Sequence, residues 1–174
     1  MDLAALVLAC APLVAPDTAH ALIQVESGGN PFAIGVVGGE LVRQPQNRAE
    51  AVATARALEE GGRNYSVGLA QINKKNFASY GLTIESAFEV CPNLTAMQGI
   101  LSECFERANK TKPEQEALRN AFSCYYSGNF VAGHKLGYVG RVLAAWSSLR
   151  QRSEQSGARG ATRQPKSISK GLTS

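Results

Sequence analysis

A glutamate, Glu26, stands on the apolar face of a short predicted helix. Ala19, Leu22 and Ile23 precede it by seven, four and three residues, which places all four side chains on one helical face. A carboxyl group partly withdrawn from water has a raised pKa, so it can stay protonated near neutral pH and act as a general acid. The periodicity alone favours another interpretation, in which a partly buried acid pairs with an arginine or caps a loop.

Three other stretches are rich in amide, hydroxyl and aromatic side chains. They are SVGLAQIN at 66–73, CYYSGNF at 124–130 and GYVGRV at 137–142. Amides and hydroxyls hydrogen-bond the hydroxyl and acetamido groups of a sugar, and aromatic rings stack on sugar faces. Around Glu26, this composition indicates a sugar site with the candidates Gly68, Gln71, Asn73, Tyr125, Tyr126, Asn129 and Tyr138.

Mostly helical elements must position these residues. Asp17 can cap a helix over 18–27, Asp2 can cap an earlier helix that ends before Pro12, and Ser66 can cap a helix after the loop at 64–73. Other predicted elements are a hairpin around the Gly-Gly turn of 32–44 and helices over 47–62, 91–108, 112–128 (with Pro113 suited to the first turn) and 137–152. We therefore predict a mainly α fold with a small β-hairpin.

The charge of the 174-residue chain is uneven. Residues 150–174 hold six Lys or Arg and one acid, a net +5, whereas residues 1–149 hold 12 bases and 13 acids, a net −1. We expect one folded domain over 1–149 and a basic, disordered tail over 150–174. The neutral domain argues against a nucleic-acid partner. The tail either touches an anionic wall polymer, a membrane or a secretion partner, or only keeps the chain soluble.

The chain has four cysteines but no CxxC pair and only two histidines, so we expect no metal site, and no cofactor is indicated. An even number of cysteines favours disulfides in an oxidising compartment, with buried thiols as the alternative. Three full pairings of Cys10, Cys91, Cys104 and Cys124 are open.

The N-terminal run LAALVLACAPLVA resembles the apolar part of a secretory signal. Its flank carries Asp2 and no basic residue, the wrong charge for an export signal. We therefore expect a structural helix here, and an export signal is not evident in this chain. No stretch reaches the roughly 18 apolar residues of a transmembrane span.

The order of the motifs resembles the soluble lytic transglycosylase family, and most closely its VirB1-like branch, which is associated with type IV secretion systems. The resemblance covers about residues 3–147, and CAP at 10–12, NPFAIGVV at 30–37 and the inserted NRAEAVATARALEEG contribute to it. The matching motifs are Glu26-Ser27-Gly28, Ser66-x-Gly68-Leu69-x-Gln71-Ile72-Asn73, Tyr125-x-x-Gly128 and Gly137-Tyr138-Val139.

The resemblance implies a lysozyme-like α+β fold, with a helical domain and a small β segment that lines a substrate cleft. Members of the family cleave the β-1,4 bond between N-acetylmuramic acid and N-acetylglucosamine in peptidoglycan and leave a 1,6-anhydromuramyl end. The expected setting is the periplasm or cell envelope, where the enzyme opens the wall locally for the secretion apparatus. Peptidoglycan strands and type IV secretion components are the implied partners.

The resemblance also makes Glu26 the single catalytic acid. Two-carboxylate glycosidases need a second acid across the bond, but Glu40 lies in the predicted hairpin, and Glu85 and Glu89 belong to no distinctive motif. The substrate's own 2-acetamido oxygen would take that place by forming an oxazolinium ion at C1. Glu26 would then act as base toward the C6 hydroxyl.

Further roles carry over by position. Ser27 would bind the acetamido group or orient the acid, and Gln71 would contact the sugar or brace the wall. Gly68 would let the backbone approach the sugar, and Tyr125 would hold the acetamido oxygen. The other implied substrate contacts are Ser66, Asn73, Tyr126, Asn129 and Tyr138.

Two positions depart from the family pattern. Ala70 stands where Met is frequent, which would widen the cleft wall, and Tyr126 stands where Asn is frequent, with Asn129 as a nearby replacement. Two rival functions remain: a hydrolysing, goose-lysozyme-like muramidase, and a non-catalytic peptidoglycan-binding assembly factor. The presence of Glu26 with both polar motifs argues against the second rival.

Overall fold

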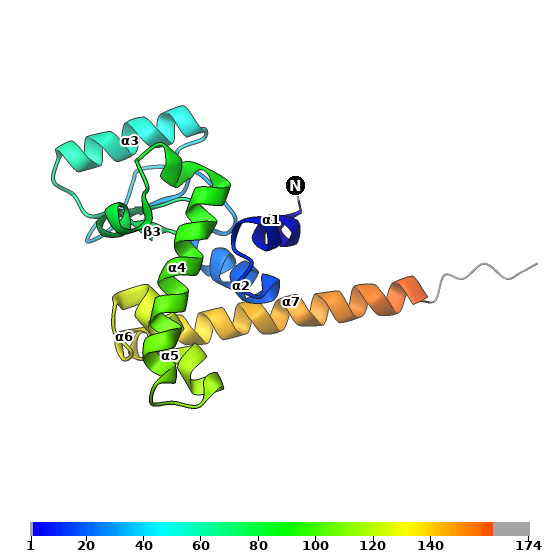
Figure 1. The fold of residues 1–174 in the computed structure, drawn as a ribbon. Coiled ribbons are helices and arrows are strands. Elements are labelled where there is room, and N and C mark those ends of the chain that lie inside the picture. Colours follow the sequence, from blue (N-terminus) through cyan, green and yellow to red (C-terminus); the bar gives the residue numbers. More distant parts are fainter. Residues whose placement is uncertain (1, 162–174) are drawn as a thin grey trace, which may run out of the picture.

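A computed structural model describes the backbone of residues 2–161 and the side chains of residues 2–155. This part of the chain contains seven α-helices, three short 3-10 helices and one three-stranded antiparallel sheet (Figure 1), which confirms the expected α+β architecture. In chain order the elements are α1 Leu3–Cys10, α2 Pro16–Ser27, β1 Ile34–Val36, α3 Arg48–Glu60, β2 Tyr65–Val67, β3 Ile72–Asn73, η1 Lys74–Asn76, η2 Ala78–Tyr80, η3 Ser86–Phe88, α4 Val90–Asn109, α5 Glu114–Ser127, α6 Ala132–Lys135 and α7 Tyr138–Ala161.

Helix α4 passes through the centre of the view in Figure 1 and contacts α1, α5 and β3. Helix α5 packs along α4, and α2 packs against both α1 and α7. The sheet and α3 lie toward one end of α4, and α5 and α6 lie toward the other (Figure 1). One apolar core joins the helices to the sheet, and its fully buried members include Val7, Leu22, Val67, Leu94 and Met97.

Local capping accounts for where two of the helices begin. Asp2 caps α1 as predicted, because its carboxylate accepts from the backbone N–H two residues on at 3.0 Å. Asn47 caps α3 in the same way, accepting from the N–H three residues on at 3.0 Å. Helix α2 instead begins at Pro16, so Asp17 lies inside its first turn and is not the cap that was predicted. Pro113 stands at the N-cap of α5, one position before the first turn.

The sheet differs from the predicted hairpin. Strand β1 pairs antiparallel with β2, which follows α3, and not with the residues after the Gly-Gly turn. The side chain of Gln44 takes the place of a neighbouring strand. Its amide accepts from the N–H of Ile34 at 2.8 Å and donates to the carbonyl of Ile34 at 2.9 Å. The pairing predicted within 32–44 is therefore wrong, although a small β segment is present.

Residues 64–73 contain a tight turn between two strands, not a loop that leads into a helix. Strand β2 pairs with β3, with Ser66 opposite Asn73, so Ser66 caps no helix. Gly68 and Gln71 both have left-handed backbone angles, with φ of 80° and 49°. The N–H of Gln71 donates to the carbonyl of Gly68 at 3.2 Å. The chain therefore reverses within four residues, which excludes the predicted helix.

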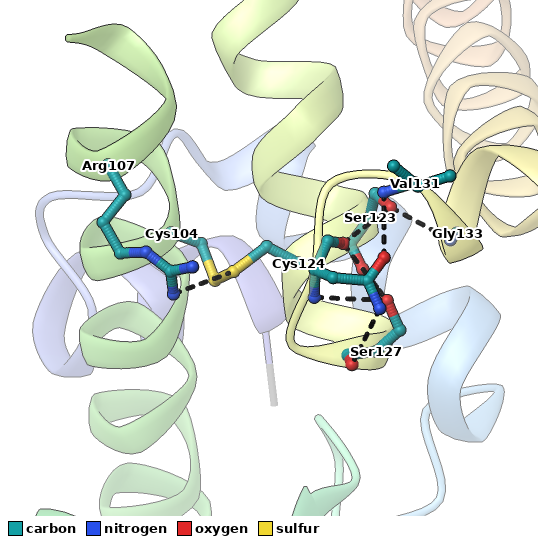
Figure 2. The surroundings of a disulfide bond; sticks show 8 residues. Cys104, Arg107, Ser123, Cys124, Ser127, Val131 and Gly133 are labelled. Carbon is teal, nitrogen blue, oxygen red and sulfur yellow. Dashed lines mark hydrogen bonds between the residues drawn. A yellow bond between two sulfur atoms is a disulfide. The ribbon is translucent and has the colours of Figure 1, made fainter.

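Two disulfides connect the helices. Cys10–Cys91 joins α1 to α4, and Cys104–Cys124 joins α4 to α5 (Figure 2). This confirms the disulfide interpretation and selects one of the three possible pairings. Arg107 lies beside the second bridge and donates to Cys124 Sγ at 3.7 Å. Because two tyrosines directly follow Cys124, this bridge anchors the end of α5 that carries them.

Helix α7 continues to Ala161, beyond Arg150, where the tail was predicted to begin. The last part of that predicted tail, residues 162–174, lies outside the described residues. No helix in the described range combines the length and apolar character needed to cross a bilayer. The same residues contain no cluster of three His, Cys, Asp or Glu side chains able to hold a metal ion.

Candidate active site

A cleft of about 670 Å³ opens between the sheet and the C-terminal ends of α2 and α5. Strand β1, the β2–β3 hairpin and η1 form one wall, and the end of α5 forms the other, with Ile100 of α4 also lining the space. Glu26 is the single carboxylic acid among the described residues that line it. The cleft therefore combines one acid with walls of amide, hydroxyl and aromatic groups.

Helix α2 brings Glu26 to the edge of this cleft. Ala19, Leu22 and Ile23, on the same face, are buried in the core, and Glu26 in the last turn is partly buried. Gly28 ends the helix in a left-handed conformation with φ of 61°. A Cβ at Gly28 would meet no atom within 4 Å, so the space beyond the helix is open. The predicted apolar face and helix end are both confirmed.

Burial raises the pKa of the Glu26 carboxyl from 4.5 to about 7. Loss of water is the largest cause, and it outweighs the hydrogen bond from Tyr138 and the charge of Arg141, which both lower the pKa. Within the described residues Glu26 forms no salt bridge, so it is not the arginine-paired acid of the alternative interpretation. The carboxyl group can therefore gain or lose a proton near neutral pH.

Tyr138, the first residue of α7, holds the carboxyl group from inside the protein. Its hydroxyl donates to Glu26 Oε1, and its side chain is only 2% exposed. Burial and the nearby Glu26 charge raise the pKa of Tyr138, so the hydroxyl stays protonated as a donor. Its ring stacks on Tyr126 with the centroids 4.6 Å apart, and the Arg141 guanidinium lies 5.8 Å from its centroid. Tyr138 does not line the cleft, which argues against the substrate contact predicted for it.

Two hydrogen bonds hold the β2–β3 turn between α2 and α5. Ser27 Oγ donates to the carbonyl of Leu69 at 2.7 Å, and the Tyr125 hydroxyl donates to the carbonyl of Ala70 at 2.6 Å. Ser27 therefore joins the helix end that carries the acid to the turn, and both roles predicted for it stay predictions. The hydroxyl proton of Tyr125 is engaged by Ala70, so in this arrangement Tyr125 offers a substrate an acceptor and not a donor.

Asn93 of α4 fixes the same turn from within the core, and its side chain is 1% exposed. Its amide donates to the carbonyls of Val67 at 3.0 Å and Ala87 at 2.8 Å. Its oxygen accepts from the N–H of Ala70 at 2.8 Å. A Cβ at Gly68 would lie 2.3 Å from Asn93 Nδ2. Gly68 is therefore needed for the approach of Asn93, and not for the approach of a sugar as predicted.

A family model, described as the transglycosylase SLT domain, matches residues 5–144 of the chain. The chain belongs to this family. The type IV secretion system protein virB1 of Brucella suis biovar 1 (strain 1330) is 53% identical over 143 residues, which is 78% of this chain and 60% of that protein. Protein virB1 of Agrobacterium tumefaciens (strain 15955) is 38% identical over 141 residues, 80% of this chain and 59% of that protein.

These relatives confirm the resemblance to the VirB1-like branch of the SLT family. The chain spans about three fifths of the length of the relatives it matches, 60% and 59% for the two proteins above. No solved structure matched the chain at a significant level.

The SLT motif residues of the hairpin line the cleft and also brace its wall. Gln71 donates to the carbonyls of Ala33 at 2.9 Å and Gly68 at 3.1 Å. The wall-bracing role predicted for Gln71 is therefore present. Asn73 donates to Ser66 Oγ at 3.2 Å across the paired strands, and both side chains line the cleft. The substrate contacts predicted for Ser66 and Asn73 stay predictions.

At the departures from the SLT pattern, the structure corrects two expectations. Ala70 is fully buried and does not line the cleft, so it does not widen the wall. Asn129 lies outside the cleft lining, and its side chain accepts from the N–H groups of Val131 and Ala132, both at 2.9 Å. It therefore caps the turn before α6 and does not replace a cleft asparagine. Tyr126 does line the cleft and is 45% exposed.

Sequence reasoning missed two residues of this SLT site. Asn93 was no candidate because its role depends on groups up to 26 residues away, which no local pattern reveals. Lys75 lines the cleft and follows the SVGLAQIN motif by two positions. Its position so close to a motif of polar residues could have marked Lys75 as a candidate for the cleft.

Proposed function

We propose that this SLT domain is a peptidoglycan lytic transglycosylase that cleaves the β-1,4 bond between N-acetylmuramic acid and N-acetylglucosamine. The observation that carries the proposal is a lone carboxyl group in the cleft with a pKa of about 7. Enzymes that add water by two-carboxylate chemistry need a second acid about 5–10 Å away across the bond. The described lining offers none, which supports a mechanism in which the substrate supplies the second function.

In the first step, protonated Glu26 donates its proton to the glycosidic oxygen while the bond from that oxygen to C1 of muramic acid breaks. The acetamido oxygen of muramic acid bonds to C1 and forms an oxazolinium ion. Glu26 is then a carboxylate. Tyr138 donates a hydrogen bond to it, and the positive charge of Arg141 also favours it. These groups stabilise the charge that the step creates on the enzyme.

In the second step, the Glu26 carboxylate removes the proton of the C6 hydroxyl. The C6 oxygen bonds to C1, the oxazolinium bond opens, and the 1,6-anhydro ring forms with Glu26 protonated again. A pKa near 7 suits a group that must act as acid and then as base in one turnover. The exposed face of Tyr126, the Tyr125 hydroxyl and the amides of Gln71 and Asn73 are the proposed sugar contacts.

The setting that we propose is the periplasm or cell envelope, with local opening of the wall for a type IV secretion system. The names of the virB1 relatives support it, because they are type IV secretion proteins. The two disulfides support an oxidising compartment.

Digestion of purified sacculi followed by mass spectrometry tests the reaction. We expect muropeptides with 1,6-anhydro ends, lighter by one water than the products of a hydrolysing muramidase. Glu26→Gln keeps the shape of the side chain and should release no products. Reducing ends from the starting protein would establish the hydrolytic alternative. Binding to sacculi without any product would establish the non-catalytic one.

A further inference from the structure

The cleft contains one cationic side chain that the protein leaves unneutralised. Lys75 is exposed and lines the cleft, and among the described residues its ammonium group has no ion pair or hydrogen bond. Glu26, the one carboxyl group in the lining, is largely held in its neutral form below pH 7 by burial. Below pH 7, Lys75 is therefore the main formal charge in the described cleft lining.

The neighbouring lysine shows that this is not a general property of the segment. Lys74 has Nζ 3.8 Å from Glu59 Oε1 and 5.6 Å from the centroid of the Tyr65 ring, so it is engaged by the protein and does not line the cleft. Asn73 caps the turn by accepting from the N–H of Lys75 at 3.1 Å, which fixes the start of η1. Of two consecutive lysines, one is paired within the fold and the other is presented to the cleft.

A neutral sugar would gain little from such a charge, whereas a carboxylate would be bound by it. Muramic acid carries a lactyl carboxyl group, and the stem peptide attached there by an amide bond carries free carboxylates of its own. We propose that Lys75 binds a carboxylate of the glycan substrate and so selects acidic over amidated peptidoglycan. The inference rests on the proposed function, because it names the part of the same substrate that Lys75 contacts.

Binding without turnover gives the most direct test. On a Glu26→Gln background, dissociation constants are measured by calorimetry for two muramic-acid-containing glycan tetramers, one with free lactyl carboxylates and one with stem peptides. Each is also measured after conversion of its carboxylates to primary amides. The decisive quantity is the ratio of the dissociation constant of the amidated form to that of the acidic form.

We expect a ratio of about two to five for at least one tetramer, as an exposed charge pair gives. The tetramer that shows it identifies the lactyl or the stem carboxylate as the group bound. Adding Lys75→Gln should bring this ratio to about one, and Lys75→Glu should bring it below one. Lys74→Gln removes the same charge from the adjacent residue and should keep the ratio of the background.

A ratio that persists in Lys75→Gln, or that falls equally in Lys74→Gln, would overturn the inference. So would a ratio of one for both tetramers before Lys75 is changed, and this result would leave the proposed function intact. If none of the four glycans binds, the proposed function fails together with the inference.

Discussion

Replacing Glu26 by glutamine should stabilise the protein at alkaline pH, and the size of the effect follows from burial of the acid. The pKa of the group is 4.5 without the fold and about 7 within it. Between these values the folded protein holds a proton that the unfolded chain has released, so the free energy of unfolding falls as the pH rises from about 4.5 to 7. At about 1.4 kcal/mol per pKa unit, the loss is roughly 3 kcal/mol.

Glutamine cannot ionise, and its amide oxygen still accepts from the Tyr138 hydroxyl. The variant should therefore match the starting protein near pH 4 and exceed its free energy of unfolding by about 2–3 kcal/mol at pH 8. Urea unfolding with both disulfides intact, followed by the fluorescence of Trp146, measures this difference across the pH range. Glu40→Gln, at an exposed position, is the control and should change the free energy by less than about 0.5 kcal/mol at any pH.

Equal free energies of unfolding for Glu26→Gln and the starting protein at pH 8 would refute the reasoning. That result would mean that the carboxyl group ionises in the fold as easily as in water. The proposed acid would then lack the proton it must donate near neutral pH.

Two other changes test the groups around the acid. Tyr138→Phe removes the hydroxyl that stabilises the Glu26 carboxylate, so the pKa of Glu26 should rise by about one unit. Because kcat/KM falls as the acid loses its proton, the alkaline limb of the kcat/KM profile should move to higher pH by about one unit. An alkaline limb at the same or a lower pH would contradict this assignment. Asn93→Ala leaves the carbonyls of Val67 and Ala87 without their buried donor. We expect a loss of about 2–4 kcal/mol in urea unfolding, and a loss below about 1 kcal/mol would show that the turn is held by other contacts.

The parts of the site that the sequence predicted well are those set by local physics. The face that carries Glu26 follows from helical periodicity, and the start of α1 follows from capping by Asp2. Each depends on groups within one or two helical turns, so the pattern is complete in a short window of sequence.

Two of the wrong predictions depend on groups far apart in the chain, and a third depends on an unusual backbone angle. Strand β1 pairs beyond an inserted helix because Gln44 occupies its other edge. The turn after β2 needs a left-handed backbone at both Gly68 and Gln71. A glycine in the sequence indicates such a conformation, but a glutamine does not. Tyr138 reaches Glu26 across 112 residues, so its role as the partner of the acid became visible only in three dimensions.

The two hydrogen bonds that hold the β2–β3 turn place different demands on the residues that donate them and on the residues that accept them. The hydroxyls of Ser27 and Tyr125 donate to the backbone carbonyls of residues 69 and 70, and not to their side chains. Every amino acid possesses such a carbonyl. These two bonds therefore do not depend on the side chains at 69 and 70, which are constrained by packing instead, because Leu69 is 6% exposed and Ala70 is fully buried. At Ser27 and Tyr125, by contrast, the side-chain hydroxyl itself makes the bond, so its loss would leave a carbonyl of the turn without this donor.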